Sequence, residues 1–379
     1  MSETSQQVSC AVVGLGHGLE DVYTVLAHPR MRLRAVCDIR QEPFEWLTGT
    51  RNLEDAGLDI SSSQAHLRMV SAIRASGDMA AVEYVHQFAD LLDRDDIQGI
   101  VLVVPDPLHE EFTVRALEAG KHVLCTKPMA TTMQGALHIA RTALQRPAHY
   151  MLGFQVSYSN FCKAILDLIA DGTIGTPRLA RFDYHRQPWR PMHRTKNAPT
   201  DGSIVKEGVH WLDLIYRING ERPWTRISGL SGKDLLEDLE FEDNGIVILD
   251  YEGGFRAAHT FTYFRKSRIE EDFLLVGDRA TVRGSFSELR LETDTAERTI
   301  GIDAMRLPDG IHFGYTAMYD EFARMVIDGT EPYSGWRNAL ENMLTCVAAQ
   351  TAVAENRTVE RSEFTTWDWR AQDQLAGHR

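Results

Sequence analysis

Apolar residues in the first third of the chain alternate between short continuous runs and segments in which they recur every three or four positions. Residues 8–13 (VSCAVV) and 99–104 (GIVLVV) are two of the continuous runs. Such runs, bounded by turn residues, are typical of strands buried on both faces, whereas the spaced segments indicate amphipathic helices. The alternation predicts a doubly wound parallel sheet over residues 1–150, with an inserted helical segment at about 50–80.

The pattern changes after residue 151, where several segments alternate between apolar and polar residues. Two helical patterns, 315–327 and 336–354, close the chain. This combination predicts a second, α+β domain over residues 151–379 with a mainly antiparallel open sheet. Its expected strands are 178–185, 227–231, 246–251, 255–264, 273–276 and 289–293.

A glycine-rich turn, GLGHG at residues 14–18, lies between the first predicted strand and the helix that follows it. In such a turn the first glycine permits a tight bend, the second lets the backbone approach a pyrophosphate, and the helix directs its free N–H groups at the phosphates. The third glycine of the usual G-x-G-x-x-G pattern is Leu19 here, but that position serves helix packing rather than phosphate contact. We therefore expect a dinucleotide to contact Gly14, Gly16, His17 and Gly18.

Asp38 ends the next predicted strand, where a carboxylate accepts hydrogen bonds from both hydroxyls of an adenosine ribose. NAD is therefore the expected cofactor. Arg40 is suited to a 2′-phosphate, which keeps NADP as the alternative, although Asp38 would repel that group.

Composition narrows the class of protein further. The net charge of −14 argues against a general surface for nucleic acids or anionic membranes. Uninterrupted apolar runs fall short of the roughly 20 residues of a membrane span, so we expect a cytoplasmic protein. The five scattered cysteines lack the spacing of metal ligands and are expected to be reduced core thiols.

Several segments follow one another in an order that resembles the glucose-fructose oxidoreductase, inositol dehydrogenase and MocA (Gfo/Idh/MocA) family. They are the glycine turn, Asp38, PDPLH at 105–109, GKHVLCTKP at 120–128, GSIVKEGVHWLDL at 202–214 and the helical segment at 331–360. The resemblance implies a Rossmann domain that carries NAD(P) and a second domain whose open sheet often forms a homo-oligomer, a dimer or tetramer. It also implies hydride transfer at a hydroxyl or carbonyl carbon of a sugar, cyclitol or sugar derivative.

The resemblance implies two catalytic residues. Lys127 matches the lysine of the family's Glu-Lys-Pro motif. In that family the lysine lies near the nicotinamide ribose and the substrate oxygen. His210 matches the histidine of its Asp-x-x-x-His segment. Removing hydride from a carbinol requires a base for the hydroxyl proton, and a histidine titrates near neutrality. We expect His210 to be that base and Lys127 to stabilise negative charge on the oxygen. Residues that follow the ends of predicted parallel strands are expected to contact the cofactor. They are Pro105, Asp106, His109, Lys127 and Pro128.

The chain departs from the family's pattern at several positions. Thr126 replaces the glutamate of Glu-Lys-Pro, Lys206 replaces the aspartate before His210, and Gln155 replaces an asparagine whose neighbouring arginine is absent. Lys206 is suited to a substrate carboxylate or phosphate, whereas Asp213 is expected to contact substrate or orient His210. The loop 184–196 contains four basic residues and no acid, which suggests an anionic or strongly polar sugar derivative held by Arg186 and Trp189. A solvated loop or an oligomer contact is the equally weighted alternative.

Two other functional classes share this fold. One is a redox-neutral enzyme of the glycosidase or lyase type, which oxidises and re-reduces a sugar with tightly held NAD. The other is a dinucleotide-binding regulator without catalysis. The presence of both Lys127 and His210 favours an enzyme, because a sensor has no need of them.

Overall fold

The structure, a computed structural model, describes residues 6–52, 64–185, 202–236, 241–263, 270–302 and 314–367. These residues divide into two compact units. The first unit contains the residues up to 130 together with 135–155 and 314–339, and the second contains 131–134, 156–302 and 340–367. Residues 314–339 therefore return to the first unit, although eight of the nine strands of the second sheet precede them in sequence. The domain boundary expected at residue 150 stays a prediction.

The first unit is built on a six-stranded parallel sheet in the order β3-β2-β1-β4-β5-β6. This is the strand order of a Rossmann fold, and it confirms the predicted doubly wound sheet. The order reverses beside β1, so the switch point lies where β1 and β4 pair. Its elements are β1 (Val8–Val13), α1 (Leu19–Ala27), β2 (Met31–Cys37), α2 (Glu42–Thr48), α3 (Gln64–Ser76), β3 (Glu83–Val85), α4 (Phe88–Leu92), β4 (Gly99–Leu102), α5 (His109–Glu118), β5 (His122–Thr126), α6 (Met133–Gln145), β6 (Tyr150–Gly153) and α9 (Tyr315–Asp328).

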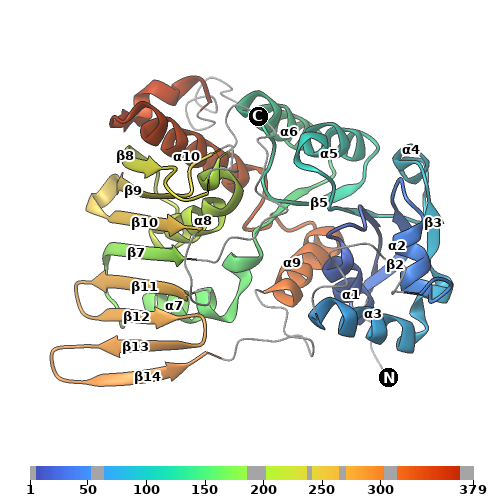
Figure 1. The fold of residues 1–379 in the computed structure, drawn as a ribbon, viewed down its shortest axis with the longest axis horizontal. Helices are drawn as coiled ribbons and strands as arrows, with labels where there is room; N and C mark the ends of the chain where they lie inside the picture. Colours follow the sequence, from blue (N-terminus) through green and yellow to red (C-terminus); the bar gives the residue numbers. More distant parts are fainter. Residues whose placement is uncertain are drawn as a thin grey trace. The chain divides into compact units, whose positions relative to one another are not determined.

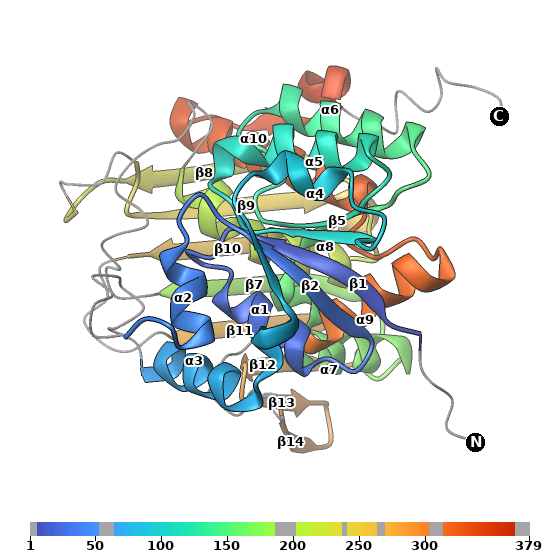
Figure 2. The same cartoon turned by 90° about the vertical axis from the view of Figure 1, so that its right-hand side faces the viewer.

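Helices cover both faces of this sheet. Figure 2 shows α5 and α6 on one face and α1, α3 and α9 on the other. Helix α9 packs on α1 and β1, and its fully buried Phe322 lies against Gly99 in β4. A Cβ at Gly99 would stand only 2.8 Å from that ring, so the glycine makes room for it. After α9, Gly335 forms an antiparallel bridge with Met151, at the β6 edge of the sheet.

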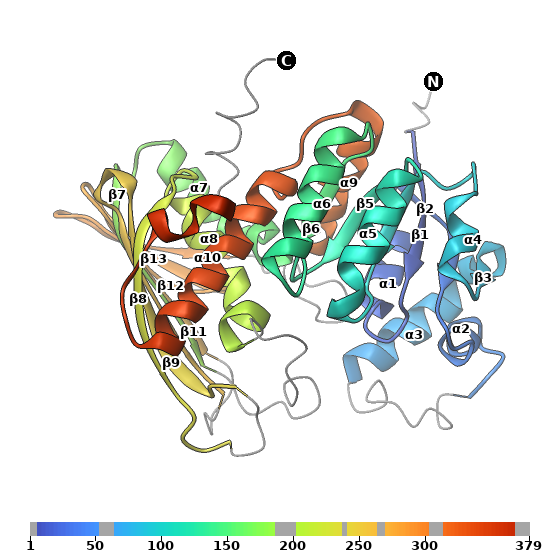
Figure 3. The same ribbon diagram turned by 90° about the horizontal axis from the view of Figure 1, so that it is seen from above.

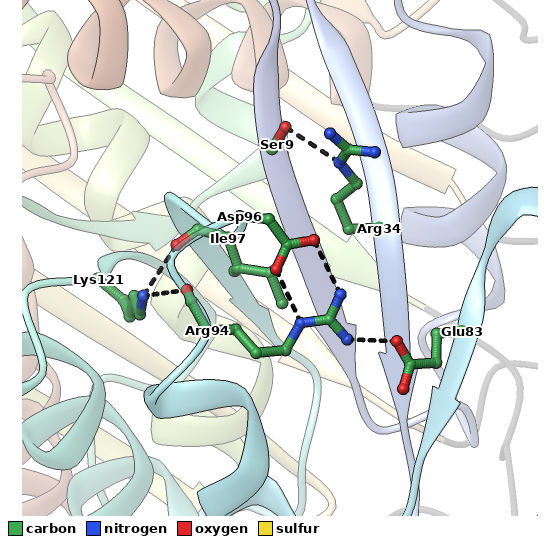
Figure 4. A network of polar contacts seen from close by, with 7 residues as sticks. All are labelled: Ser9, Arg34, Glu83, Arg94, Asp96, Ile97 and Lys121. Carbon is green, nitrogen blue, oxygen red and sulfur yellow. Dashed lines mark hydrogen bonds and ion pairs between the residues drawn. The ribbon is translucent and has the colours of Figure 1, made fainter.

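A polar network closes the edge of the sheet where the strands begin (Figure 4). The buried Lys121 donates hydrogen bonds from Nζ to the carbonyl oxygens of Arg94, at 2.6 Å, and Ile97, at 3.0 Å. The Arg94 guanidinium in turn contacts the carboxylates of Glu83 and Asp96. Ligands of such sheets bind at the opposite, carboxyl edge, so this network serves stability.

The second unit is built on a nine-stranded sheet in the order β14-β13-β12-β11-β7-β10-β9-β8-β15 (Figure 1). Every neighbouring pair is antiparallel except β7 and β10, which confirms the mainly antiparallel sheet. Its elements are α7 (Asn160–Ala170), β7 (Pro177–His185), α8 (Val209–Ile218), β8 (Trp224–Gly232), β9 (Asn244–Tyr251), β10 (Arg256–Thr262), β11 (Glu270–Gly277), β12 (Thr281–Ser285), β13 (Glu288–Glu292), β14 (Glu297–Gly301), α10 (Trp336–Glu355) and β15 (Val359–Glu360).

The two faces of the nine-stranded sheet differ. Figure 3 shows α7, α8 and α10 on one face, where Phe182 and Val247 are buried. The opposite face bears the exposed apolar side chains of Leu179, Leu230 and Ile248, set among ion pairs of arginines and aspartates. One face is therefore core, and the other is a mixed surface of exposed apolar side chains and ion pairs.

Two further observations bear on the expectations from composition. All five cysteines are buried with free thiols, as expected for reduced core residues. Among the described helices, none combines the length and hydrophobicity that crossing a bilayer requires.

Candidate active site

The glycine turn between β1 and α1 is shaped by contacts with the backbone. Gly14 has a φ of 91°, and a Cβ there would stand 2.1 Å from the carbonyl oxygen of Val103. A Cβ at Gly18 would stand 2.2 Å from the Gly14 carbonyl oxygen. A Cβ at Gly16 would meet nothing within 4 Å. Gly14 and Gly18 are thus required by the turn itself, whereas the backbone at Gly16 is open to a ligand, as a dinucleotide phosphate requires.

Asp38 fastens this turn to the end of β2. Its Oδ2 accepts a hydrogen bond from the backbone N–H of Leu15 at 2.7 Å, and its Oδ1 accepts one from the N–H of Arg40 at 2.9 Å. Each carboxylate oxygen has a second lone pair, so the ribose hydroxyls of a nucleotide still find acceptors there. The Arg40 guanidinium lies 4.0 Å from Oδ1 and is half exposed. The residues present therefore fit the adenosine half of NAD.

The ends of β4 and β5 are held together by His109, the first residue of α5. Its Nδ1 lies 2.6 Å from the carbonyl oxygen of Pro128, and its Nε2 lies 2.9 Å from that of Val104. The side chain is fully buried. Both ring nitrogens thus face backbone oxygens, and the expected contact of His109 with the cofactor stays a prediction. Lys127 joins Pro128 through a cis peptide bond in the same segment.

The buried imidazole has an unusual pKa. Burial acts to lower the pKa of His109, but Cys125, Asp106 and the Pro128 carbonyl together raise it to about 9. Cys125 lies in β5, and Asp106 lies in the short turn before α5. Cys125 was not predicted as a neighbour of His109, because its position within an apolar strand indicates only a core residue.

In the second unit, Lys206, His210 and Asp213 lie on one continuous helical segment. A π-helical turn at Ile204–Gly208 runs directly into α8, and π-turns inside helices are frequent at functional sites. Lys206 and His210 are 7% and 6% exposed, so both are buried except for a small part of their surface. The Lys206 Nζ lies 5.6 Å from the centre of the Phe241 ring, a contact that the sequence did not indicate.

Asp213, one turn further along α8, has no exposed surface. Its carboxylate accepts a short hydrogen bond from the Ser157 hydroxyl, and the Arg217 guanidinium donates to the Ser157 carbonyl oxygen. Both alternatives expected for Asp213, a substrate contact and the orientation of His210, stay predictions. Gln155 begins the same short helical turn as Ser157 and is half buried. Arg186 and Trp189 lie outside the described residues.

Sequence comparisons place both units in one family. Residues 8–154 match the NAD-binding Rossmann fold of the Gfo/Idh/MocA oxidoreductase family, and residues 167–360 match that family's C-terminal alpha/beta domain. The chain is 31% identical over 154 residues to inositol 2-dehydrogenase of Klebsiella pneumoniae, a match that covers 38% of this chain and 44% of that protein. It is 25% identical over 288 residues to 1,5-anhydro-D-fructose reductase of Ensifer adhaerens, covering 72% of this chain and 82% of that protein. The matches to the inositol dehydrogenases thus span about half of their length.

Solved structures agree with the fold. An oxidoreductase from Agrobacterium radiobacter in complex with NAD⁺, L-tartaric acid and magnesium superposes with a TM-score of 0.78 at 15% identity, covering 95% of this chain and 100% of that chain. Both halves of the sequence and both sheets lead to the same conclusion. The chain belongs to the Gfo/Idh/MocA family of oxidoreductases, with an NAD-binding Rossmann domain at its N-terminal side.

Proposed function

We propose that this protein is an NAD-dependent oxidoreductase that transfers hydride between the nicotinamide and a hydroxyl or carbonyl carbon of a sugar, cyclitol or related polyol. The observation that carries the proposal is the open glycine turn fastened to Asp38, within a unit that matches the family's NAD-binding domain. The similarity to an inositol dehydrogenase and to an anhydrofructose reductase supports the substrate class.

NAD, when bound, supplies the hydride acceptor. In the oxidation direction the substrate's C–H bond breaks with both electrons going to the nicotinamide, and the hydroxyl proton has to leave at the same time. In our proposal His210 receives that proton. The ammonium group of Lys127 stabilises the negative charge that builds on the substrate oxygen. Reduction runs through the same residues in reverse.

Lys206 gives this site a cation where the family has an acid. Its ammonium group is held over the face of Phe241, on the turn that leads directly to His210. A lysine is an effective point charge for carboxylates and phosphates. We therefore propose that the preferred substrate carries an anionic or strongly polar group. A Lys206→Met variant should lose turnover of uronates or sugar phosphates more than that of neutral polyols, and an equal loss for both would contradict this role.

The proposed activity is tested by absorbance at 340 nm with NAD or NADP and a panel of inositol, aldoses, 1,5-anhydro-D-fructose, uronates and sugar phosphates. We expect reduction of NAD with at least one of them. Lys127→Met and His210→Asn should each lower kcat by about 10²- to 10⁴-fold. Exposed Lys163 and His138 offer matched controls, Lys163→Met and His138→Gln, which should leave kcat unchanged. If the protein binds the cofactor but no compound of the panel changes the absorbance at 340 nm, the proposed dehydrogenase activity is refuted and redox-neutral chemistry is favoured.

The open face of the nine-stranded sheet supports a proposal about assembly. Leu230 and Ile248 are 60% and 50% exposed on adjacent strands of that face. Large apolar side chains grouped on one exposed face, with charged residues around them, are typical of a protein interface. We propose that a second copy of the chain covers it. Replacing Leu230 and Ile248 with lysine should shift the mass measured by light scattering to that of the monomer, whereas an unchanged mass would refute this interface.

A further inference from the structure

The ring of His109 lies between two backbone carbonyl oxygens that belong to different strand ends. Val104 follows β4 and Pro128 follows β5, and these two strands are neighbours in the parallel sheet. The nitrogen-to-oxygen distances of 2.6 and 2.9 Å are both within hydrogen-bonding range. One side chain therefore connects the ends of two strands at the carboxyl edge of the sheet, where cofactors bind in such folds.

The chemistry of these partners decides the protonation state of the ring. A carbonyl oxygen only accepts hydrogen bonds, and a neutral imidazole donates from only one of its two nitrogens. Both contacts are hydrogen bonds only when the ring is an imidazolium. A neutral ring would place a buried lone pair against one of the carbonyl oxygens, at the cost of an unsatisfied polar group.

The surroundings of the ring favour the charged form. Asp106 approaches from the turn before α5, and Cys125 approaches from β5. Together with the Pro128 carbonyl they offset the burial that would otherwise lower the pKa of His109, and they bring it to about 9. These neighbours and the two carbonyl oxygens therefore favour the imidazolium over the neutral ring.

We propose that His109 is a positioning residue, which holds the Lys127 segment in place by donating hydrogen bonds from both ring nitrogens to the carbonyls of Val104 and Pro128. Because the Pro128 carbonyl is one residue from Lys127, fixing it fixes the backbone from which the lysine side chain extends. This inference rests on the proposed catalytic function of Lys127. Small displacements of a catalytic group cost as much as 10²-fold in rate, so a loss of this connection should be visible in kcat.

The first test needs no substrate. Nitrogen NMR of the full chain with ¹⁵N-labelled histidine, assigned by comparison with His109→Gln, reports the protonation of each ring nitrogen. We expect both nitrogens of His109 to be protonated at pH 7 and the ring to titrate at about 9. A neutral tautomer at pH 7 would overturn the proposal. Because this experiment involves no turnover, its result is independent of whether the proposed dehydrogenase activity is correct.

The second test uses turnover with NAD and the best substrate of the panel. His109→Gln should lower kcat by about 10- to 100-fold while the KM for NAD changes little. His122→Gln, at the other end of β5, is the matched control and should leave kcat unchanged. The wild-type kcat should fall as pH rises through about 9, and the variant should lack that fall. A His109→Gln variant with normal kcat and an unchanged pH profile would overturn the proposal.

A double variant separates this inference from the function on which it rests. If His109 acts through Lys127, then adding His109→Gln to Lys127→Met should lower kcat no further than Lys127→Met alone. Fully multiplicative losses would show that His109 acts by another route and would overturn the proposal. Normal turnover by Lys127→Met itself would instead refute the proposed function of the lysine.

Discussion

Asp21 should make the stability of the first unit depend on pH. Its carboxylate is 2% exposed on α1 and accepts a hydrogen bond from the Tyr319 hydroxyl of α9 at 2.8 Å. Burial raises the pKa of Asp21 from 3.8 to about 7, with a further increase from Glu20, while the hydrogen bond from Tyr319 opposes the rise. The carboxyl group is therefore held partly protonated at neutral pH, between two helices that are distant in sequence.

The sign and size of the effect follow from that pKa. The unfolded chain releases the Asp21 proton near pH 4, whereas the folded chain holds it up to about 7. The contribution to stability is therefore complete below pH 4, falls as pH rises between 4 and 7, and is lost above 7. Each pKa unit corresponds to 1.36 kcal/mol, so the total loss is about 4 kcal/mol. An Asp21→Asn variant, which has no proton to lose and still accepts from Tyr319, should escape it.

The assay is urea unfolding of wild type and Asp21→Asn at several pH values from 4 to 9. Because the chain has two compact units, unfolding of the first unit is best followed by hydrogen exchange in peptides from α1 and α9. The free energy of unfolding of the variant should equal that of wild type near pH 4 and exceed it by up to about 4 kcal/mol at pH 8. Asp328→Asn, an exposed carboxylate at the end of α9, is the control and should change little. Parallel pH dependences for wild type and Asp21→Asn would refute the reasoning.

Three further predictions concern the first unit. Gly14→Ala should destabilise it by about 3 kcal/mol and abolish the thermal shift given by NADH, because a Cβ would strike a backbone carbonyl oxygen. Gly120→Ala, at a similar positive φ but in open space, should cost only about 1 kcal/mol. Asp38→Ser should raise the ratio of kcat/KM for NADP to that for NAD by roughly 100-fold, since it removes about 3 kcal/mol of repulsion with the 2′-phosphate; an unchanged ratio would place the ribose elsewhere. Lys121→Met should lower the free energy of unfolding by about 2 kcal/mol in urea titrations, because two loop carbonyls lose their donor, whereas exposed Lys163→Met should not.

The sheets were predictable where their strands bury one or both faces. The parallel strands β1 and β4 are continuous apolar runs, and the alternation in β9 and β10 follows their two different environments. Four short strands were missed for a common reason: β3, β12, β14 and β15 contain charged residues and bury too little to produce a pattern. The parallel pairing of β7 with β10 was also beyond reach, since it depends on which strands meet in space rather than on local sequence.

The candidate site shows a similar division. The glycine turn and Asp38 were recognisable because a dinucleotide demands particular residue types at particular places. The ring contacts of His109 were not predicted, because both partners are backbone carbonyls, which every residue type carries. The hydrogen bond between Asp213 and Ser157 could not be predicted either, because the two residues are far apart in sequence.

The return of α9 to the first unit has a consequence for how the chain folds in the cell. A ribosome releases the polypeptide from its N terminus, and many domains fold as soon as they have emerged. Here the helix that brings Tyr319 to Asp21 and Phe322 to Gly99 is made only after eight of the nine strands of the second sheet. The surface of α1 and β1 that α9 covers therefore stays exposed while the strands of the second sheet are synthesised. Chaperones that shield apolar surface should associate with nascent chains until α9 has been made.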